Sequence, residues 1–259
     1  MKINDILFEL FRKRAESVLV DHLCVGLGYT AVATSDGGIG IAYTWLDKKK
    51  SCCVWARYEN PEGAPAIGML EQIRGINPLG RTVALAVINA LNHRAARDIP
   101  EDDGNEALAD RLCIGKGTRV AMVGAFAPLL GPLRKRGAAI EVVDIGKGVG
   151  DRDRFRDRLG GWADVLIMTS TTLINNTTEE ILEYVGPNVR TVLLGPSTPL
   201  VKEPFSHLPV HLLAGTVLLD RDAVLRSVRH GAGTPVIQKF GRKVVLEMEK
   251  RQAGILKTE

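Results

Sequence analysis

The sequence lacks an apolar segment long enough to cross a membrane, and it lacks an apolar leader. The apolar run at 83–88 is far shorter than the roughly 20 residues that a membrane helix needs. Near the N-terminus, Asp5, Glu9 and Arg12 interrupt the apolar residues, whereas a secretory signal needs an unbroken apolar stretch of roughly 7–15 residues. We therefore expect a cytoplasmic protein without a membrane anchor.

Cysteine is scarce, and its spacing forms no Cys-x-x-Cys pair. The 4 cysteines are Cys24, Cys52, Cys53 and Cys113. We expect reduced, mostly buried thiols and no disulfide framework. Cys52 and Cys53 would point to opposite faces of a strand, and Pro209 disfavours a helix that would align His207 with His211. The sequence thus shows no strong soft-metal pattern, and a metal site assembled across two domains stays open.

A large excess of charge of one sign is also absent. The formal net charge is +4, and the basic residues are dispersed along the chain. Nucleic-acid-binding proteins concentrate Lys and Arg on one face, so we do not expect a nucleic-acid partner. Hydrophobic residues make up 45% and charged residues 25% of the 259 residues, which is typical of a packed globular protein of one or two domains.

The first hundred residues mix helical and strand patterns. Apolar residues at helical spacing predict a helix over 3–19. The β-prone runs 24–34 and 39–44 flank an Asp-Gly turn and predict an antiparallel hairpin, and a further extended piece is expected at 51–57. Two more helices are predicted at 65–74 and 79–93. We interpret this part as a small α+β domain.

A polar stretch at 97–105 contains Pro and Gly and has no hydrophobic periodicity. Such a composition is typical of a linker. We therefore predict two domains, spanning 1–100 and 101–259.

Beyond the linker, continuous apolar runs alternate with helical patterns. Strands are predicted at 119–123, 139–144, 163–168, 190–194 and 211–213. Helices are predicted between several of them, at 128–136, 177–185 and 221–229. Continuous apolar runs suit strands that are buried on both faces, and the alternation predicts an α/β fold with a Rossmann-like, doubly wound parallel sheet.

Acidic and basic residues alternate over 151–158. Because the charges nearly cancel, we interpret this run as a solvated, internally paired helix rather than a phosphate site. Phe155 and Leu159 are spaced to pack together on the sheet.

Small and hydroxyl residues follow each predicted strand of this sheet. In a doubly wound sheet these positions meet at the carboxyl edge, where ligands bind. Hydroxyls and backbone N–H groups suit anionic oxygens, although the same residue types also serve as ordinary turn and capping residues. The predicted ligand-binding residues are Gly124, Phe126, Asp144, Thr169, Ser170, Thr171, Thr172, Asn175, Gly195, Ser197, Thr198, Gly215 and Thr216, with Asn89 from the first domain.

A dinucleotide fingerprint is incomplete. Phe126 stands where the second glycine after Gly124 belongs, and Pro128 opens the next helix. Asp144 lies twenty positions after Gly124, where a ribose-binding acid would lie. Ordinary NAD binding is therefore disfavoured, and a nucleoside cofactor stays open. No Gly-x-Ser-x-Gly elbow is present, and Ser197 lies in a Pro-rich turn, so a serine nucleophile is not indicated.

The ordered motifs at these loops resemble an uncharacterised prokaryotic family that is labelled for heavy-metal chelation. The motifs include 123–129, 163–167, 169–175, 194–200 and 213–217, with 77–79 and 86–90 in the first domain. The resemblance implies a Rossmann-like domain over about 105–250 and a partner that is folded like the N-terminal domain of enolase. It places a site in the cleft between the two domains. A fold of that kind does not bring enolase chemistry with it.

Our leading hypothesis is a protein that binds a heavy metal, a metal chelate or a small anionic molecule in the interdomain cleft. The second is an enzyme of the group-transferase type that uses a nucleoside cofactor, and the third is a dimeric scaffold without catalysis. The sequence identifies no reaction and no cofactor beyond the metal ion that the resemblance implies. It also leaves a homo-oligomer open.

Overall fold

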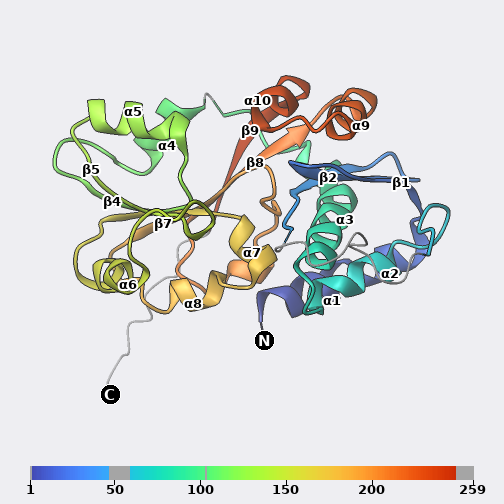
Figure 1. Cartoon of the computed structure of the whole chain (residues 1–259), viewed down its shortest axis with the longest axis horizontal. Helices are drawn as coiled ribbons and strands as arrows, with labels where there is room; N and C mark the ends of the chain where they lie inside the picture. Colours follow the sequence, from blue (N-terminus) through green and yellow to red (C-terminus); the bar gives the residue numbers. More distant parts are fainter. Residues whose placement is uncertain (1, 47–58, 103, 249–259) are drawn as a thin grey trace, which may run out of the picture.

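The computed structural model of the chain describes residues 2–46, 59–102 and 104–248. It has a mixed α/β fold with two separate sheets (Figure 1). The smaller sheet is antiparallel, in the order β1-β2-β3, and the larger has the order β5-β4-β6-β7-β8-β9. Strands β4 to β8 are parallel, and β9 is antiparallel at one edge. The predicted α/β class, with a mostly parallel sheet after a smaller α+β part, is confirmed.

The N-terminal elements are α1 (Ile3–Ser17), β1 (Val20–Val25), β2 (Tyr29–Thr34), β3 (Ile39–Tyr43), α2 (Ile67–Leu70), η1 (Glu71–Arg74) and α3 (Pro78–Ala96). The predicted hairpin is confirmed as β2 and β3, which join at a turn where Gly37 has a φ of +83°. Strand β1 was not predicted separately, because Asp21 and His22 break its apolar pattern. The extended piece expected at 51–57 lies outside the described residues.

Helix α3 is buried on nearly all sides because it packs between the small sheet and helices α1 and α7. Its start is set by Asn77, whose side chain accepts a hydrogen bond from the Leu79 N–H at 3.0 Å, and by Pro78 in the first turn. A Cβ added to Gly40 would lie 2.2 Å from the nitrogen of Ala90. Glycine at this position therefore allows the sheet to approach the helix backbone.

Five of the six strands of the large sheet begin close to their predicted positions, and β9 was not predicted. They are β4 (Arg119–Val123), β5 (Ala139–Val143), β6 (Val165–Thr169), β7 (Arg190–Leu194), β8 (Leu212–Leu218) and β9 (Gly241–Glu247). The prediction that Gly215 and Thr216 lie in a loop is wrong, because both belong to β8. Strand β9, which the sequence did not indicate, pairs with β8 along its whole length and keeps it extended.

The remaining elements are α4 (Asn105–Arg111), α5 (Ala127–Lys135), η2 (Ile145–Lys147), α6 (Arg152–Gly161), α7 (Thr171–Asn175), α8 (Thr178–Leu182), η3 (Glu203–Phe205), α9 (Arg221–Arg229), α10 (Thr234–Ile237) and η4 (Gln238–Phe240). Helices α4 and α5 cover one face of the large sheet, and α6 to α8 lie on the other (Figure 1). Helix α4, which begins at the last residue of the predicted linker and continues beyond it, was not predicted. Across the described ranges, none of the helices combines the length and apolar character needed to span a membrane.

Helix α9 packs on the small sheet, although it follows a strand of the large one. Val224 and Val228 join Tyr29, Ala31 and other residues of the small sheet in one apolar cluster. The small sheet therefore lies between α3 on one face and α9 on the other (Figure 1), which explains why every residue of β2 is buried.

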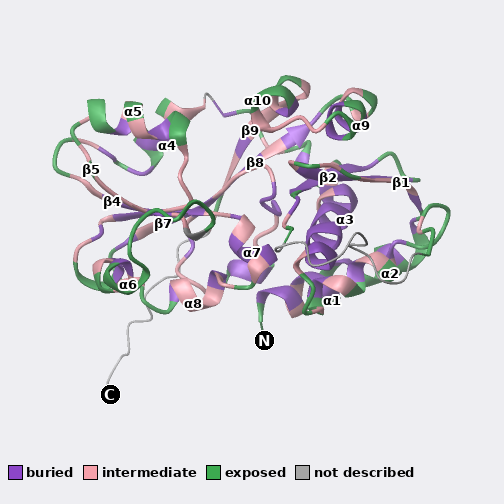
Figure 2. Ribbon diagram, viewed as in Figure 1, coloured by how far each residue is buried: buried purple, intermediate pink, exposed green. Residues whose placement is uncertain are grey.

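A second apolar cluster runs through both halves of the molecule. It includes Leu7 of α1, Leu85 of α3, and Leu166 and Leu193 of the large sheet. Figure 2 shows this buried region continuing from α3 toward the large sheet. The two sheets are thus joined by a shared core, and the domain boundary near residue 100 stays a prediction.

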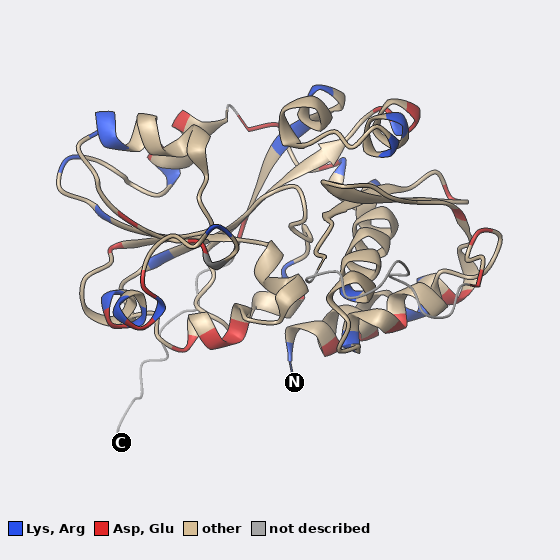
Figure 3. Ribbon diagram, in the orientation of Figure 1, with Lys and Arg blue, Asp and Glu red and all other residues tan. Residues whose placement is uncertain are grey.

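The alternating charges at 151–158 form most of helix α6, as predicted. Phe155 and Leu159 are 4% and 1% exposed and anchor the helix to the sheet. The expectation of internal pairing is largely wrong. Arg152 and Arg156 pair with Glu180 of α8. Arg154 and Arg158 pair with Glu141 of β5. Among the described ion pairs, the pair of Arg156 with Asp153 lies within the helix. The arginines on this surface (Figure 3) therefore tie α6 to its neighbours.

Candidate functional site

The order β5-β4-β6 creates a switch point in the large sheet. The chain passes from β4 to β5 on one side of it and then returns to form β6 on the other side of β4. The loops after β4 and β6 touch there. A Cβ added to Gly124, whose φ is +87°, would lie 3.0 Å from Cγ2 of Thr169. Both residues are partly exposed. Sequence and fold thus bring Gly124 and Thr169 together at the position where ligands of such sheets bind.

Asp144 joins the loop after β5 to the loop after β4. Its Oδ2 accepts a hydrogen bond from the Ala125 N–H at 2.9 Å, and its Oδ1 accepts one from the Lys147 N–H at 3.2 Å. The Nζ of Lys147 lies 3.4 Å from Oδ2 of Asp144 and 3.4 Å from the carbonyl oxygen of Ala125. Both carboxylate oxygens of Asp144, which would have to accept hydrogen bonds from ribose hydroxyls, therefore already accept hydrogen bonds from the loop.

The run of hydroxyl residues after β6 divides into two faces. Thr169 and Thr171 are partly exposed, and their Oγ1 atoms are 3.1 Å apart. Ser170 and Thr172 are buried, and their hydroxyls donate to the carbonyls of Leu194 and Thr169 at 3.3 and 2.8 Å. Thr169 and Thr171 thus face solvent, whereas Ser170 and Thr172 hold the turn.

The start of helix α5 does not form an open phosphate cradle. The Ala127 N–H donates to the carbonyl of Ala125, and the Leu129 N–H donates to that of Phe126. Pro128 has no N–H to offer. The ring of Phe126 packs with the apolar cluster under α4 and α5, and it lies 3.9 Å from where a Cβ on Gly124 would be. This geometry agrees with the argument against ordinary dinucleotide binding.

We call the residues of these loops that are partly or fully exposed the switch-point rim. It consists of Gly124, Ala125, Phe126, Asp144, Lys147, Thr169, Thr171 and Gly195. Gly195 closes one side, because its φ is +133° and a Cβ there would lie 3.2 Å from Oγ of Ser170. Lys147 was not among the predicted residues. Its signal in the sequence is a lysine between two glycines, three residues after Asp144.

The other predicted residues lie mainly in the seam between the two sheets, and they are used to close it. The Oγ of Ser197 accepts a hydrogen bond from the Tyr43 N–H at 2.8 Å. The Nδ2 of Asn89 donates to the carbonyl of Ile41 at 2.9 Å and to that of Ser197 at 3.4 Å. Thr82 donates to the carbonyl of Tyr43 at 3.1 Å. Asn89 and Ser197 therefore form hydrogen bonds with backbone groups of β3, which is the edge strand of the small sheet.

The seam leaves little free space. Thr198 donates to the carbonyl of Ala214 at 2.9 Å, and a Cβ on Gly215 would lie 3.0 Å from Leu200. Thr216 and Asn89 line a cavity of about 20 Å³, which holds about one water molecule. Asn175, outside the seam, accepts a hydrogen bond from Thr177 at 2.7 Å at the end of α7. Most of the predicted residues thus separate into the switch-point rim and a closely packed seam, while Ser170, Thr172 and Asn175 form hydrogen bonds within the loop after β6 and helix α7.

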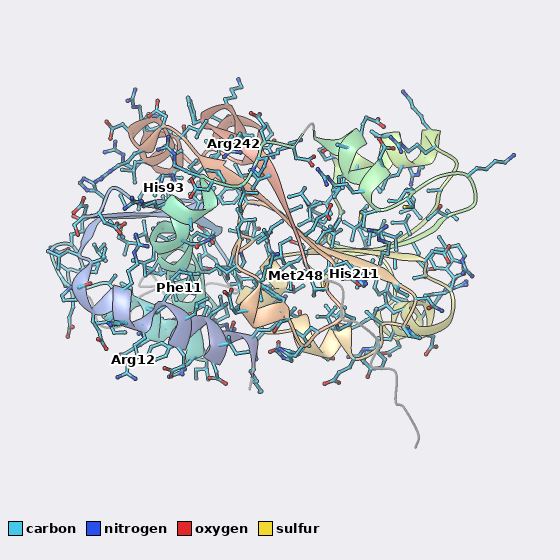
Figure 4. All side chains as sticks on the ribbon, turned by 180° about the vertical axis from the view of Figure 1, so that it is seen from behind. Phe11, Arg12, His93, His211, Arg242 and Met248 are labelled. Carbon is cyan, nitrogen blue, oxygen red and sulfur yellow. The ribbon has the colours of Figure 1, made fainter. Side chains whose placement is uncertain are left out.

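The described residues do not contain a group of three or more His, Cys, Asp or Glu side chains that could hold a metal ion. Figure 4 shows His93 and His211 in separate parts of the molecule. His93 bonds through Nε2 to the carbonyl of Leu218 at 2.8 Å, and Nδ1 of His211 accepts from the Thr191 N–H at 3.1 Å. The donor set described here does not fit a resident heavy-metal ion.

The two cysteines within the described residues are less buried than expected. Cys24 is half-buried, and burial raises the pKa of its thiol, an effect that Arg229 opposes. Cys113 is exposed, and its Sγ accepts a hydrogen bond from Arg190 at 3.3 Å. Cys52 and Cys53 lie outside the described residues.

Comparison with known proteins shows relatives along nearly the whole chain. An uncharacterised protein of Methanocaldococcus jannaschii is 23% identical over 267 aligned positions, which cover 96% of this chain and 97% of that protein. A protein of unknown function from Pyrococcus horikoshii has a similar structure, with a TM-score of 0.73, 22% identity, and coverage of 95% of this chain and 98% of that one. A protein of unknown function from Desulfitobacterium hafniense DCB-2 has a TM-score of 0.73, 21% identity, and coverage of 94% and 98%. Both structures belong to the DUF364 family, and at these identities they show a shared fold.

Two family models match the chain, and both carry the description "Putative heavy-metal chelation". The DUF4213 model matches residues 8–92, and the DUF364 model matches residues 107–247. The resemblance found in the sequence is confirmed. Since the second match covers more than half of the 259 residues, this chain belongs to the DUF364 family.

Proposed function

We propose that this protein binds a small anionic ligand at the switch-point rim, and that the chelate of a heavy metal is the first candidate. The observation that carries the proposal is the pair of partly exposed hydroxyls of Thr169 and Thr171 beside Gly124 at the sheet crossover. The ammonium group of Lys147 lies on the same rim, against the carbonyl of Ala125. Hydroxyl donors and a lysine suit the oxygens of an anion.

The chelate reconciles the family description with the donor set of this chain. The two matching models are described by heavy-metal chelation, whereas the described residues form no cluster of three metal ligands. A metal that is already held by a small chelator needs no such cluster, because the chelator supplies the ligand atoms. The metal is then cargo, and the protein recognises the oxygens of its carrier. The proposal includes no catalytic step.

The residues of the seam support the rim in this proposal. A ligand placed deep between the sheets would have to break the hydrogen bonds from Asn89 and Tyr43 to the loop that holds Ser197. Binding at the rim requires no such opening. Ser170 and Thr172 contribute by holding the turn that presents Thr169 and Thr171.

Elemental analysis of the purified protein, followed by calorimetry, tests the proposal. We expect zinc citrate to bind the whole chain more tightly than zinc chloride. Thr171→Ala should weaken binding by about tenfold or more, since a hydrogen bond to a charged group contributes roughly 1.5–3 kcal/mol. Thr118→Ala is the matched control. Thr118 directly precedes β4, at the end of that strand away from the rim, and its Oγ1 accepts a hydrogen bond from the Gly115 N–H.

Unchanged affinity in Thr171→Ala would contradict the placement at the rim. Binding of free zinc with an affinity equal to that of the citrate complex would contradict recognition of a chelate. S-adenosylmethionine and ATP form a separate arm of the experiment. Saturable binding of either would favour a nucleoside-cofactor enzyme instead.

A further inference from the structure

A second cavity, of about 120 Å³, lies where the start of α1, the segment around η1 and the end of α7 meet. Its polar lining comes from Lys2, Asn4, Asp5, Arg74, Arg81 and Asn176. The volume accommodates several water molecules or one small ion. The cavity is separate from the switch-point rim, because α7 carries Thr171 at its first residue and is followed by Asn176 at its other end.

Asn4 is the feature of this cavity that requires an occupant. Its side chain is buried, with 8% of the residue exposed, and its Nδ2 donates to Oδ1 of Asn176 at 3.4 Å. Among the described residues, the Oδ1 of Asn4 finds no hydrogen-bond donor. A buried acceptor without a partner costs roughly 1–3 kcal/mol. A bound group that donates a hydrogen to Asn4 would remove this cost.

The surroundings of Asn4 favour an anion. Helix α1 has 15 residues, and the positive end of its dipole lies at this cavity; in its first turn, the N–H of Asp5 already donates to the carbonyl of Lys2 at 3.0 Å. The N–H of Ile3, the first residue of the helix, donates a hydrogen bond to Oε1 of Glu179 at 2.8 Å. Asn4 is the next residue of the helix. Lys2 lies at the helix start, and basic side chains outnumber acidic ones in the lining.

The two arginines of the lining are held in place by other contacts. The guanidinium of Arg81, which is largely buried, donates to the carbonyl of Gly75 at 2.6 Å and to that of Ile174. Arg74 lies 3.3 Å from Asp5 and 2.8 Å from Glu9, so Asp5 is already paired. The wall is therefore preformed. Its lining holds the basic side chains of Lys2, Arg74 and Arg81 and the acid Asp5, while Glu9 and Glu179 lie outside the lining and contact Arg74 and the Ile3 N–H.

We propose that this cavity is a second ligand site, for a small oxyanion that also carries a hydroxyl hydrogen, such as hydrogen phosphate. The anionic oxygens face the start of α1, Lys2 and the arginine side of the wall, and the hydroxyl donates to Oδ1 of Asn4. Sulfate has the same size and shape but carries no hydrogen at neutral pH. It would place an acceptor against the acceptor of Asn4, so the site discriminates against it.

Calorimetry on the full chain, with inorganic phosphate and with sulfate in a phosphate-free buffer, tests this site. We expect saturable binding of phosphate, and binding of sulfate that is weaker by about tenfold or more, the equivalent of about 1.4 kcal/mol. Asn4→Ala should weaken phosphate binding by about tenfold and reduce the difference between the two ions. Lys2→Ala, at an exposed position, should weaken the binding of both ions several-fold.

Asn176→Gly is the second variant if Asn4→Ala does not fold. Asn176 has a φ of +62°, which glycine adopts freely, so the change removes the side chain without backbone strain. Asn105→Ala is the matched control, because Asn105 also begins a helix but its side chain bonds to Lys243, outside the cavity.

Absence of phosphate binding, equal affinity for sulfate, or unchanged phosphate affinity in both Asn4→Ala and Asn176→Gly would each overturn the proposal. The result is independent of the rim, since Thr171→Ala should leave phosphate binding unaltered here. Loss of phosphate binding in Thr171→Ala would instead assign the phosphate to the rim.

Discussion

The carboxylate of Asp144, directly after β5, accepts a hydrogen bond from the backbone N–H of Ala125, two residues after β4, at 2.9 Å. This contact joins the two loops on one side of the sheet crossover. With the close approach of Gly124 to Thr169 on the other side, it makes the switch-point rim a connected surface. The rim is therefore built before any ligand arrives, which lowers the entropic cost of binding.

Asp144→Ala should lower the free energy of unfolding by about 1–3 kcal/mol, because the N–H groups of Ala125 and Lys147 lose their acceptor. Urea denaturation measures the change. Asp157→Ala, at an exposed position of α6, is the control and should stay within about 0.5 kcal/mol of the wild type. Equal effects of the two substitutions would show that Asp144 does not organise the loop.

Ser197→Ala should destabilise the protein by about 1–3 kcal/mol, because it leaves the N–H of Tyr43 without its acceptor at the edge of β3. Ser197 is 2% exposed, so water cannot readily replace the hydroxyl. Ser206→Ala is the matched control, since the hydroxyl of Ser206 is exposed and donates to Glu203 in the adjacent turn. A Ser197→Ala protein as stable as the control in thermal unfolding would argue against this role.

His211→Asn should flatten the pH dependence of stability between about pH 7 and pH 5. Burial, together with the positive charge of Arg190, lowers the pKa of His211. The unfolded chain, with a histidine pKa of about 6.5, then takes up the proton first as the pH falls. The contribution of neutral His211 is therefore complete above about pH 6.5 and is lost as the pH drops through the folded pKa.

Asparagine tests this linkage because its Oδ1 can still accept from the Thr191 N–H, whereas it does not titrate. Urea midpoints measured across this pH range give the comparison. Parallel curves for the two proteins would show that His211 does not contribute to the pH dependence.

Gly40→Ala and Gly68→Ala should have opposite effects on stability. A Cβ on Gly40 would lie 2.2 Å from the Ala90 nitrogen and 2.3 Å from the Ala86 carbonyl oxygen, so the sheet and α3 would have to separate. We expect a loss of about 3 kcal/mol or more, as for other severe core clashes. Gly68 lies within α2, with nothing within 4 Å of an added Cβ and no proline after it, so alanine should stabilise the protein by up to about 1 kcal/mol. Equal midpoints in urea would contradict both expectations.

Much of the candidate rim could be predicted from the sequence. Gly124, Thr169 and Thr171 follow apolar runs, and the carboxyl ends of parallel strands share one edge. Lys147 was missed because its place between two glycines after Asp144 does not show that its ammonium group lies against the loop after β4. The structural role of Ser197 and Asn89 was also unpredictable, because the partner of each is a backbone group of β3, far away in the chain.

The sequence by itself determined the α/β class, the parallel strands β4 to β7 and the apolar side of α6, because these depend on periodicity among neighbouring residues. Only the tertiary structure decided that α9 covers the small sheet, that β9 extends β8 through Gly215 and Thr216, and that the seam is filled. These outcomes depend on contacts between distant segments. Apolar burial is favourable against any apolar surface, so a local pattern shows that a face is covered and leaves open which element covers it.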